Sequence, residues 1–443
     1  MFTCLVGFDG DNFFMQLLRL VFRVSGCLLK ALSSTKLGVC ACLLIWLAPL
    51  HAQEVRLSNL LELAMLRHPT ILQARNQAKA SGFDLEAAKW GRFPTVSSDL
   101  RSDTNYVQSV AKLEQPLWAG GRIDGRIDVG QANLRAAQAS VQEAELNALS
   151  QVGNSFFEVL RLSARLQTAQ DNIKEHERLR DLISRRVQAE ISPPADLTLA
   201  TARLQQALTE QLQIQRQLES AKFSLSQWAG PLTGPLKEPS HIAYKRLLSD
   251  ASVVEQAQKA SAQRLRLQAQ IESAQAQMQV AKAQGLPTVV AGYQYITAGP
   301  MALGLERGST YIGLQFQPGA GLSALSGIQS AISKKEAAEQ ELAALDRSLE
   351  NQAKTLYSDI DVLAAQLKPA QSLQDDTAEL VESYLRQYQI GRKNWLDVLN
   401  ALREKTQAIY NLADVRYGLL QSQVKLMLLI GELGAEKTSV IHE

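Results

Sequence analysis

Few side chains of this 443-residue chain have the type and spacing that catalysis or metal binding requires. The histidines form neither an H-E-x-x-H motif nor a pair at metal-ligand spacing; they are His51, His68, His176, His241 and His442. The glycines around Pro318 lack the lysine of a phosphate-binding loop. We therefore expect no catalytic residue, no metal site and no cofactor, and a function that depends on contacts rather than on a reaction.

The cysteines all lie near the N-terminus, at Cys4, Cys27, Cys40 and Cys42. The surrounding segment has the pattern of an export signal, because lysines precede an apolar run (37–50) and L-H-A at residues 50–52 fits a processing site. The run is shorter than the ~20 residues that span a bilayer, although a membrane anchor and lipidation at Cys42 are the alternatives. We predict a signal peptide over residues 1–52, with Met15 as a second candidate start, and a mature chain without disulfides or thiolate metal sites.

The composition favours long helices over compact domains. Hydrophobic residues make up 46% of the chain but aromatic residues only 6%, and Ala, Gln and Leu dominate stretches such as residues 271–284. Small residues let helices approach closely, as in extended coiled-coil packing. The net charge of +2 gives no nucleic-acid footprint. Because no later segment reaches about 18 consecutive apolar residues, we expect any membrane contact of the mature chain to use strands.

One sequence pattern occurs twice. A-K-W-G-R-F-P-T-V at residues 88–96 returns as A-K-A-Q-G-L-P-T-V at residues 281–289. In the same way, R-R-V-Q-A-E-I-S-P-P-A-D at residues 185–196 returns as R-Q-Y-Q-I-G-R-K-N-W-L-D at residues 386–397. A duplicated unit of this size predicts two similar halves packed side by side rather than a short-period array.

We place the first repeat at residues 53–230 and the second at residues 250–433. Between them lies a proline-rich linker (231–249), and a short tail (434–443) follows the second repeat. Each repeat is expected to contain a helix, two strands, a very long helix and another helix.

In the first repeat we expect a helix from an N-cap at Ser58 to Trp90, ended by Pro94. Two strands follow within residues 95–117 around a turn at 103–105. A helix of ~60 residues, ~90 Å long, is expected from about Ile127, and a returning helix over residues 196–227.

The second repeat is expected to carry the corresponding elements. They are a helix over about 252–284, strands near 288–297 and 309–317, a long helix over about 325–389, and a last helix from Trp395 to about Leu433. Pro369 lies within the long helix, where we expect a kink with a small bulge or local unwinding.

The fold class is therefore mostly α with a small β part: duplicated long-helix coiled-coil hairpins with two β-hairpins per chain. Four strands cannot close a membrane barrel, for which about eight is the minimum. The duplication thus predicts that strands from several chains combine.

The chain resembles the TolC-type outer-membrane channel family, the exit ducts of efflux pumps and type I secretion systems. The resemblance covers almost all of the mature chain. It rests on R-H-P at residues 67–69, on E-Q-P-L-W-A-G-G-R at residues 114–122, and on Y-Q-I-G-R-K-N-W-L-D-V-L-N-A at residues 388–401. It implies a homotrimer with a 12-stranded β-barrel in the outer membrane and an α-helical tunnel through the periplasm. It also implies a passive, non-enzymatic role beside a periplasmic adaptor and an inner-membrane transporter.

The segment N-W-L-D-V-L-N-A-L-R-E at residues 394–404 is similar to the type I secretion branch of this family. That branch implies an ABC-type transporter as partner and a large adhesin or toxin as cargo. The alternatives are a multidrug or metal efflux channel and, outside the class, a periplasmic coiled-coil scaffold that forms no pore.

The resemblance also implies roles for residues at the turns of the helix pairs. Asp196 matches the family acid that holds the periplasmic tip closed, and Tyr388 and Lys393 match its partners. Asp397 matches the acid that forms a ring around the aperture, and Asn400 stands where some members have a second acid. The alternatives are helix capping for Asp196 and Asp397 and interhelix packing for Tyr388.

The same turns are the expected docking sites for the adaptor: Glu190, Ile191 and Ser192 in the first repeat, and Gly391 and Arg392 in the second. Gly391 also suits a turn that needs a positive φ, whereas the first repeat has Glu190 in the glycine-containing family turn. Trp118 is expected in an aromatic belt at the membrane interface, with plain packing as the alternative.

Overall fold

The structure of the protein is a computed structural model, which describes residues 54–103, 106–239, 241–242, 244, 249–297, 307–317, 319–321, 323–433 and 441–442. The predicted signal peptide and most of the C-terminal tail lie outside these residues, as do positions 104 and 105 of the predicted strand turn. The expectation of a mostly helical chain with four strands in two hairpins is confirmed.

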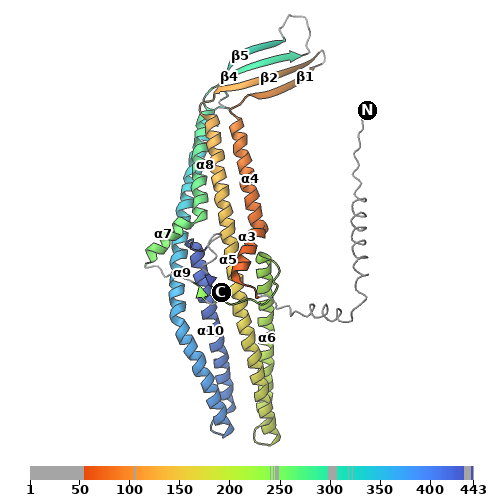
Figure 1. Ribbon diagram of the computed structural model, residues 1–443, viewed down its shortest axis with the longest axis vertical. Helices are drawn as coiled ribbons and strands as arrows, with labels where there is room; N and C mark the ends of the chain where they lie inside the picture. Colours follow the sequence, from red (N-terminus) through yellow and green to blue (C-terminus); the bar gives the residue numbers. More distant parts are fainter. Residues whose placement is uncertain are drawn as a thin grey trace, which may run out of the picture. The chain divides into compact units, whose positions relative to one another are not determined.

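The chain is built as two matching series of elements (Figure 1). The first repeat contains α3 (Leu57–Arg67), α4 (Pro69–Trp90), β1 (Thr95–Asp103), β2 (Tyr106–Trp118), α5 (Arg122–Gln188) and α6 (Pro194–Ala229). The second contains α7 (Asp250–Ala260), α8 (Ala262–Gln284), β4 (Thr288–Thr297), β5 (Gly308–Gln315), α9 (Ser323–Gln389) and α10 (Trp395–Leu429). The two long helices, α5 and α9, have 67 residues each, so each is about 100 Å long at 1.5 Å per residue.

The first helix of each repeat is broken, which the sequence interpretation missed. α3 ends before His68, whose ψ of 128° is extended, because a proline disfavours the helical conformation in the residue before it and Pro69 follows. Ser58 is therefore not an N-cap; α3 begins at Leu57, after Arg56. In the second repeat Ser261 separates α7 from α8, and its side chain caps α8 by accepting a hydrogen bond from the Arg264 amide.

Two other helix positions differ from those expected. α5 begins at Arg122 rather than near Ile127, directly after Gly121, whose φ of 84° turns the chain from strand to helix. Pro369 lies inside α9, which stays α-helical on both sides of it, so the expected bulge or unwinding is absent there.

β1, β2, β4 and β5 form one antiparallel sheet in the order β1-β2-β4-β5, which lies at one end of α4, α5, α8 and α9. Two further short strands, β3 (His241–Ile242) and β6 (Ile441–His442), pair separately. Residues that pair across strands share a face, as do alternate residues along a strand. Large exposed apolar side chains lie on one face: Val96, Leu100, Leu113, Tyr293, Ile312 and Leu314. The other face carries Asp99, Lys112, Glu114, Gln294 and Tyr311.

A side-chain contact crosses three strands on this polar face. Glu114, Gly292 and Tyr311 are aligned on β2, β4 and β5, and the Tyr311 hydroxyl donates a hydrogen bond to Glu114 Oε1. The phenol lies directly over Gly292, where an added Cβ would come within 2.4 Å of the Tyr311 ring. Because Gly292 has no side chain, the Tyr311 side chain can extend from β5 across β4 to Glu114 on β2.

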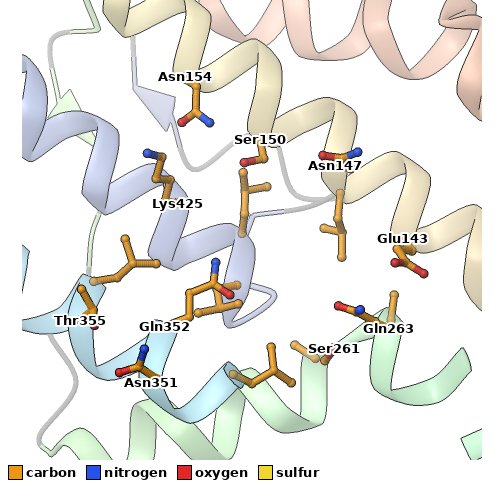
Figure 2. A pocket seen from close by; sticks show the side chains of 17 residues that line it. Glu143, Asn147, Ser150, Asn154, Ser261, Gln263, Asn351, Gln352, Thr355 and Lys425 are labelled. Atoms are coloured by element: carbon orange, nitrogen blue, oxygen red, sulfur yellow. The ribbon is translucent and has the colours of Figure 1, made fainter. Parts of the chain in front are cut away.

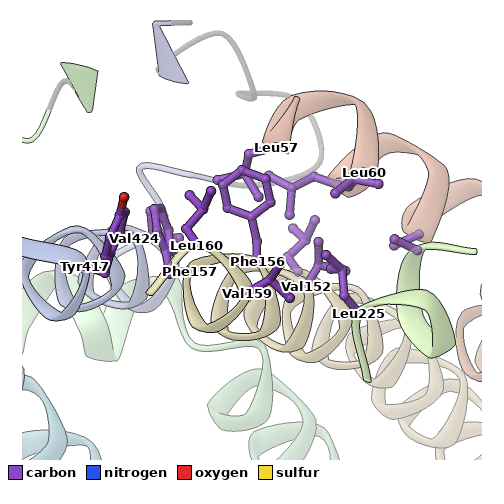
Figure 3. Close-up of a cluster of buried hydrophobic side chains, with 14 of the residues drawn as sticks. Leu57, Leu60, Val152, Phe156, Phe157, Val159, Leu160, Leu225, Tyr417 and Val424 are labelled. Atoms are coloured by element: carbon purple, nitrogen blue, oxygen red, sulfur yellow. The ribbon is translucent and has the colours of Figure 1, made fainter. Parts of the chain in front are cut away.

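The largest group of buried side chains lies where α3, α5, α6 and α10 meet (Figure 3). Phe156 and Phe157 pack edge-to-face at its centre, and Leu57 and Leu225 are fully buried around them. The linker is tied to this region by Glu238, which pairs with Arg416 at 2.7 Å and accepts a hydrogen bond from the Tyr417 hydroxyl. None of the helices in the described ranges is long and apolar enough to cross a membrane.

Candidate functional site

The candidate site lies at the two helix turns, one between α5 and α6 and one between α9 and α10, at the ends of the long helices away from the sheet (Figure 1). Both turns close in the same way. The Ile191 amide bonds to the Arg186 carbonyl and the Glu190 amide to that of Val187. At the second turn the Arg392 and Gly391 amides bond to the Gln387 and Tyr388 carbonyls. Each is a Schellman motif, so the predicted alignment of 185–196 with 386–397 holds in three dimensions.

The two turns differ at the residue with positive φ. Gly391 has a φ of 77° and Glu190 has a φ of 58°; Glu190 is the one non-glycine residue with positive φ in the described chain. Left-handed backbone costs an ordinary L-residue roughly 1–2 kcal/mol because its Cβ crowds the following carbonyl. The first turn therefore holds strain that the second avoids.

Tyr388 is packed into a small apolar cluster behind the second turn. Its side chain is 6% exposed, and its ring lies 5.7 Å from that of Trp395 at a tilt of 47°. The Arg186 guanidinium from α5 lies 4.9 Å from the Tyr388 ring centroid. The Tyr388 hydroxyl and the Trp395 indole nitrogen are both buried without a hydrogen-bond partner in the described chain.

Lys393 and Asp397 lie together at the start of α10. Lys393 Nζ is 3.8 Å from Asp397 Oδ2 and 4.2 Å from the centroid of the Tyr384 ring. Asp397 also accepts a hydrogen bond from the Asn394 amide at 3.3 Å. Asp397 therefore caps α10, the alternative that the sequence left open, and it holds a counter-ion as well.

Asp196 occupies the corresponding position in the first turn of α6. Its side chain is half-buried and makes no hydrogen bond or ion pair within the described chain. The structure of one chain thus brings Lys393 to Asp397, and it does not bring Asp196 to Tyr388 or Lys393. A carboxylate left unpaired at this position is available to a group from outside the chain.

Asn400 is exposed and lines a cavity of 110 Å³ between α5, α6 and α10. His176 and Arg203 lie on its α5 and α6 sides, and Arg403 follows Asn400 by one turn on α10. Burial lowers the pKa of His176, and the charge of Arg203 lowers it further. These basic groups were not predicted, because the cavity joins the consecutive helices α5 and α6 to α10, which is distant in sequence.

The side chains proposed for adaptor docking are mostly exposed at the turns. Ile191 is 63% exposed, and Ile390, beside Gly391, is 66% exposed. Ser192 differs, because its hydroxyl lies 3.4 Å from Arg186 Nε and accepts a hydrogen bond from it. Arg392 makes no side-chain hydrogen bond or ion pair within the described residues.

Trp118 lies at the end of β2 and is half exposed. It pairs with Val289 after a shift of register at Pro116, which places it on the apolar face of the sheet. An exposed indole at the end of an apolar sheet face has the amphipathic character of interface residues.

Comparison with known proteins covers both repeats. The family model described as outer membrane efflux protein matches residues 60–231 and 253–432, which is most of the chain. The two segments begin within α3 and α7 and end one residue beyond Gly230 and Gly431, both of which have positive φ. No curated protein matches the sequence.

Solved structures share the fold. A membrane protein from Pseudomonas aeruginosa is 17% identical with a TM-score of 0.73, over 85% of this chain and 93% of that chain. The outer membrane protein VceC from Vibrio cholerae is also 17% identical, with a TM-score of 0.71 over 85% of this chain and 96% of its own. The CmeC outer membrane channel from Campylobacter jejuni is 12% identical with a TM-score of 0.73, over 86% of this chain and 87% of that chain.

The strained turn gives a direct prediction. Glu190→Gly should raise the free energy of unfolding by about 0.5–1 kcal/mol, because glycine adopts a positive φ without a Cβ clash. Thermal unfolding would measure the gain in stability, and amide exchange at residues 190–192 should become slower. Glu190→Ala is the matched control, since it removes the carboxylate and keeps the Cβ. Equal stability of the glycine and alanine variants would contradict this account.

Proposed function

This chain belongs to the outer membrane efflux protein family, and on that basis we propose that it is the exit duct of a tripartite export system, giving passive passage to a cargo delivered by an inner-membrane transporter. The resemblance to TolC-type channels is thereby confirmed. The protein is located in the outer membrane and extends into the periplasm.

The observation that best supports a role as an export duct is that the four-stranded sheet has one apolar and one polar face. One face is apolar and exposed, and the other carries Asp99, Lys112 and Glu114. This alternation is the pattern of strands with lipid on one side and water on the other. β1 and β5 are the two edges of the sheet, and exposed edges are not tolerated within lipid. Three chains, with four strands each, would pair these edges into a closed 12-stranded barrel.

We predict that the mature protein is recovered from the outer-membrane fraction as a homotrimer that resists mild detergents. Native mass determination and cross-linking after detergent extraction would measure this state. A soluble periplasmic monomer or dimer would exclude the duct and favour the scaffold. The proposed boundaries, with a signal peptide removed after residue 52 and a linker at 231–249, would be checked on the same material by N-terminal sequencing and limited proteolysis.

For the cargo we propose type I secretion of a large adhesin-like or toxin-like protein, with an ABC-type transporter and an adaptor as partners. The resemblance of residues 394–404 to that branch supports this choice. The second candidate is efflux of drugs or metals, which the family description favours.

Deletion of the gene should remove one large protein from the culture medium and leave drug and metal susceptibility unchanged. Secretome mass spectrometry and inhibitory concentrations would be compared for the deletion strain with and without the restored gene. An unchanged secretome with increased drug or metal sensitivity would instead assign the protein to efflux. The scaffold role is tested separately by the trimer experiment.

For the gate we propose that Asp196 pairs with Tyr388 and Lys393 of a neighbouring chain, because its side chain has no hydrogen bond or ion pair with the described residues of its own chain. Asp397 would form a ring of three carboxylates around the aperture, with Lys393 as the counter-ion of each. Because Asn400 stands where some family members have a second acid, the aperture would have one acidic ring rather than two. The turns at residues 190–192 and 391–392 would dock the adaptor, and Trp118 would lie at the membrane interface.

The double variant Tyr388→Phe with Lys393→Ser should open the tip and raise single-channel conductance in planar bilayers. Each contact is worth ~1 kcal/mol, and its loss in three chains changes the populations of the closed and open tip more than tenfold. Asp397→Ala should weaken cation preference and block by multivalent cations, because it removes the ring of like charges.

Lys174→Ser is the control for loss of a lysine, since Lys174 pairs with Asp171 on the exposed side of α5. If the double variant stays trimeric and conducts like the parent, these residues only pack and cap, and the gate lies elsewhere.

A further inference from the structure

A cavity of 710 Å³ lies where the ends of α8 and α10 meet between the long helices α5 and α9 (Figure 2). Its wall combines carboxamides and hydroxyls from α5, α8 and α9 with several leucines. The polar members include Asn147, Ser150, Gln263, Gln352 and Thr355. Its size and mixed wall suit a small organic molecule, whose sites commonly measure about 300–1,000 Å³.

The duplication explains why this space is open. Ala88 aligns with Ala281, so His68 aligns with Ser261. Both residues follow the first short helix of their repeat and cap the next one. Arg185 aligns with Arg386, so Trp228 aligns with Leu429.

In the first repeat the His68 and Trp228 rings stack on each other, with centroids 4.4 Å apart and planes 15° apart. In the second repeat the same two positions hold a serine and a leucine, and both line the cavity. The two rings that close the junction in the first repeat are therefore missing from the second.

One cation, Lys425, lines the cavity without forming an ion pair with any of the described residues. Lys425 on α10 is half-buried and makes no ion pair or hydrogen bond within the described residues. Burial lowers its pKa, and the more distant Asp359 partly opposes that effect. Glu143, the one carboxylate in the wall, is paired with Arg266 at 2.8 Å. An ammonium group that is partly removed from water is stabilised when an anion binds beside it.

We propose that this cavity binds an amphipathic organic anion, a molecule with one carboxylate or sulfonate group and an apolar ring or chain. Lys425 binds the acidic group, and neighbouring amide and hydroxyl groups donate hydrogen bonds to it. The leucines surround the apolar body in the space that two aromatic rings fill in the first repeat. This site is separate from the proposed gate and does not depend on the identity of the exported cargo.

The test uses naphthalene-2-sulfonate as the probe and the purified full-length protein in lipid nanodiscs, with empty nanodiscs as the reference. Isothermal titration should show saturable binding of one probe per chain. Lys425→Met should weaken binding at least tenfold, and the neutral analogue 2-naphthol should bind the parent at least tenfold more weakly. Lys354→Met is the matched control and should bind like the parent, since Lys354 pairs with Glu350 at 2.6 Å on another helix.

The variant Ser261→His with Leu429→Trp places the His68–Trp228 pair of the first repeat at the matching positions of the second. It should abolish binding, while the thermal unfolding temperature stays at or above that of the parent. Lys425→Gln is a second variant that removes the charge, and it is used if Lys425→Met fails to fold. The proposal is overturned if the parent shows no saturable binding or if Lys425→Met and Lys425→Gln bind like the parent. The proposal would also be overturned if the parent bound 2-naphthol as tightly as naphthalene-2-sulfonate, or if a folded Ser261→His, Leu429→Trp variant bound the probe like the parent.

Discussion

The packing of shorter helices along α5 and α9 is the constraint on which the rest of the structure depends. A single long helix gains little from its own backbone and needs burial of a face to be stable. Small residues provide that face on α5: Gly130 faces Leu85, where an added Cβ would come within 3.2 Å of the Leu85 backbone, and Gly125 faces Val280. These close approaches align α4 and α8 on either side of α5 and fix where each strand pair begins.

The ends of the short helices then decide how the two repeats differ. α5 packs against α4 near the sheet and against α6 near the turn, and α9 packs in the same way against α8 and α10. The junction of each repeat is the place where the two shorter helices meet. The first junction is filled by the His68–Trp228 stack and by the cluster around Phe156. The second has smaller side chains and leaves a cavity with a wall of mixed polar and apolar side chains. The repeats have thus kept one backbone plan while their junctions have different chemistry.

Much of the architecture could be predicted because its signals are local and occur twice. Thr288–Thr297 was predicted as a strand with the bounds that the structure has, and the paired turns were aligned correctly. The break at His68 was visible in R-H-P. Ser261 has no proline after it, and the break there separates α7, which packs on α9, from α8, which packs on both α5 and α9. At the turns, the capping role of Asp397 is local and was among the alternatives. The contact of Arg186 with Tyr388 joins two helix pairs, and no spacing rule reveals it.

The Tyr311 side chain that crosses Gly292 affects how firmly each edge strand is held in the sheet. It joins the edge strand β5 to β2 through Glu114 and so links β2, β4 and β5 by a side-chain contact in addition to their backbone ladders. The other edge strand, β1, contacts only β2 within the described sheet, through the backbone ladder and a hydrogen bond from the Thr95 hydroxyl to the Glu114 carbonyl. An edge strand that opens offers its amides and carbonyls to any passing strand. The two edges are therefore unequal: β5 is held across two strands, whereas β1 is held by its neighbour alone and is the edge with less protection against pairing with an incorrect strand.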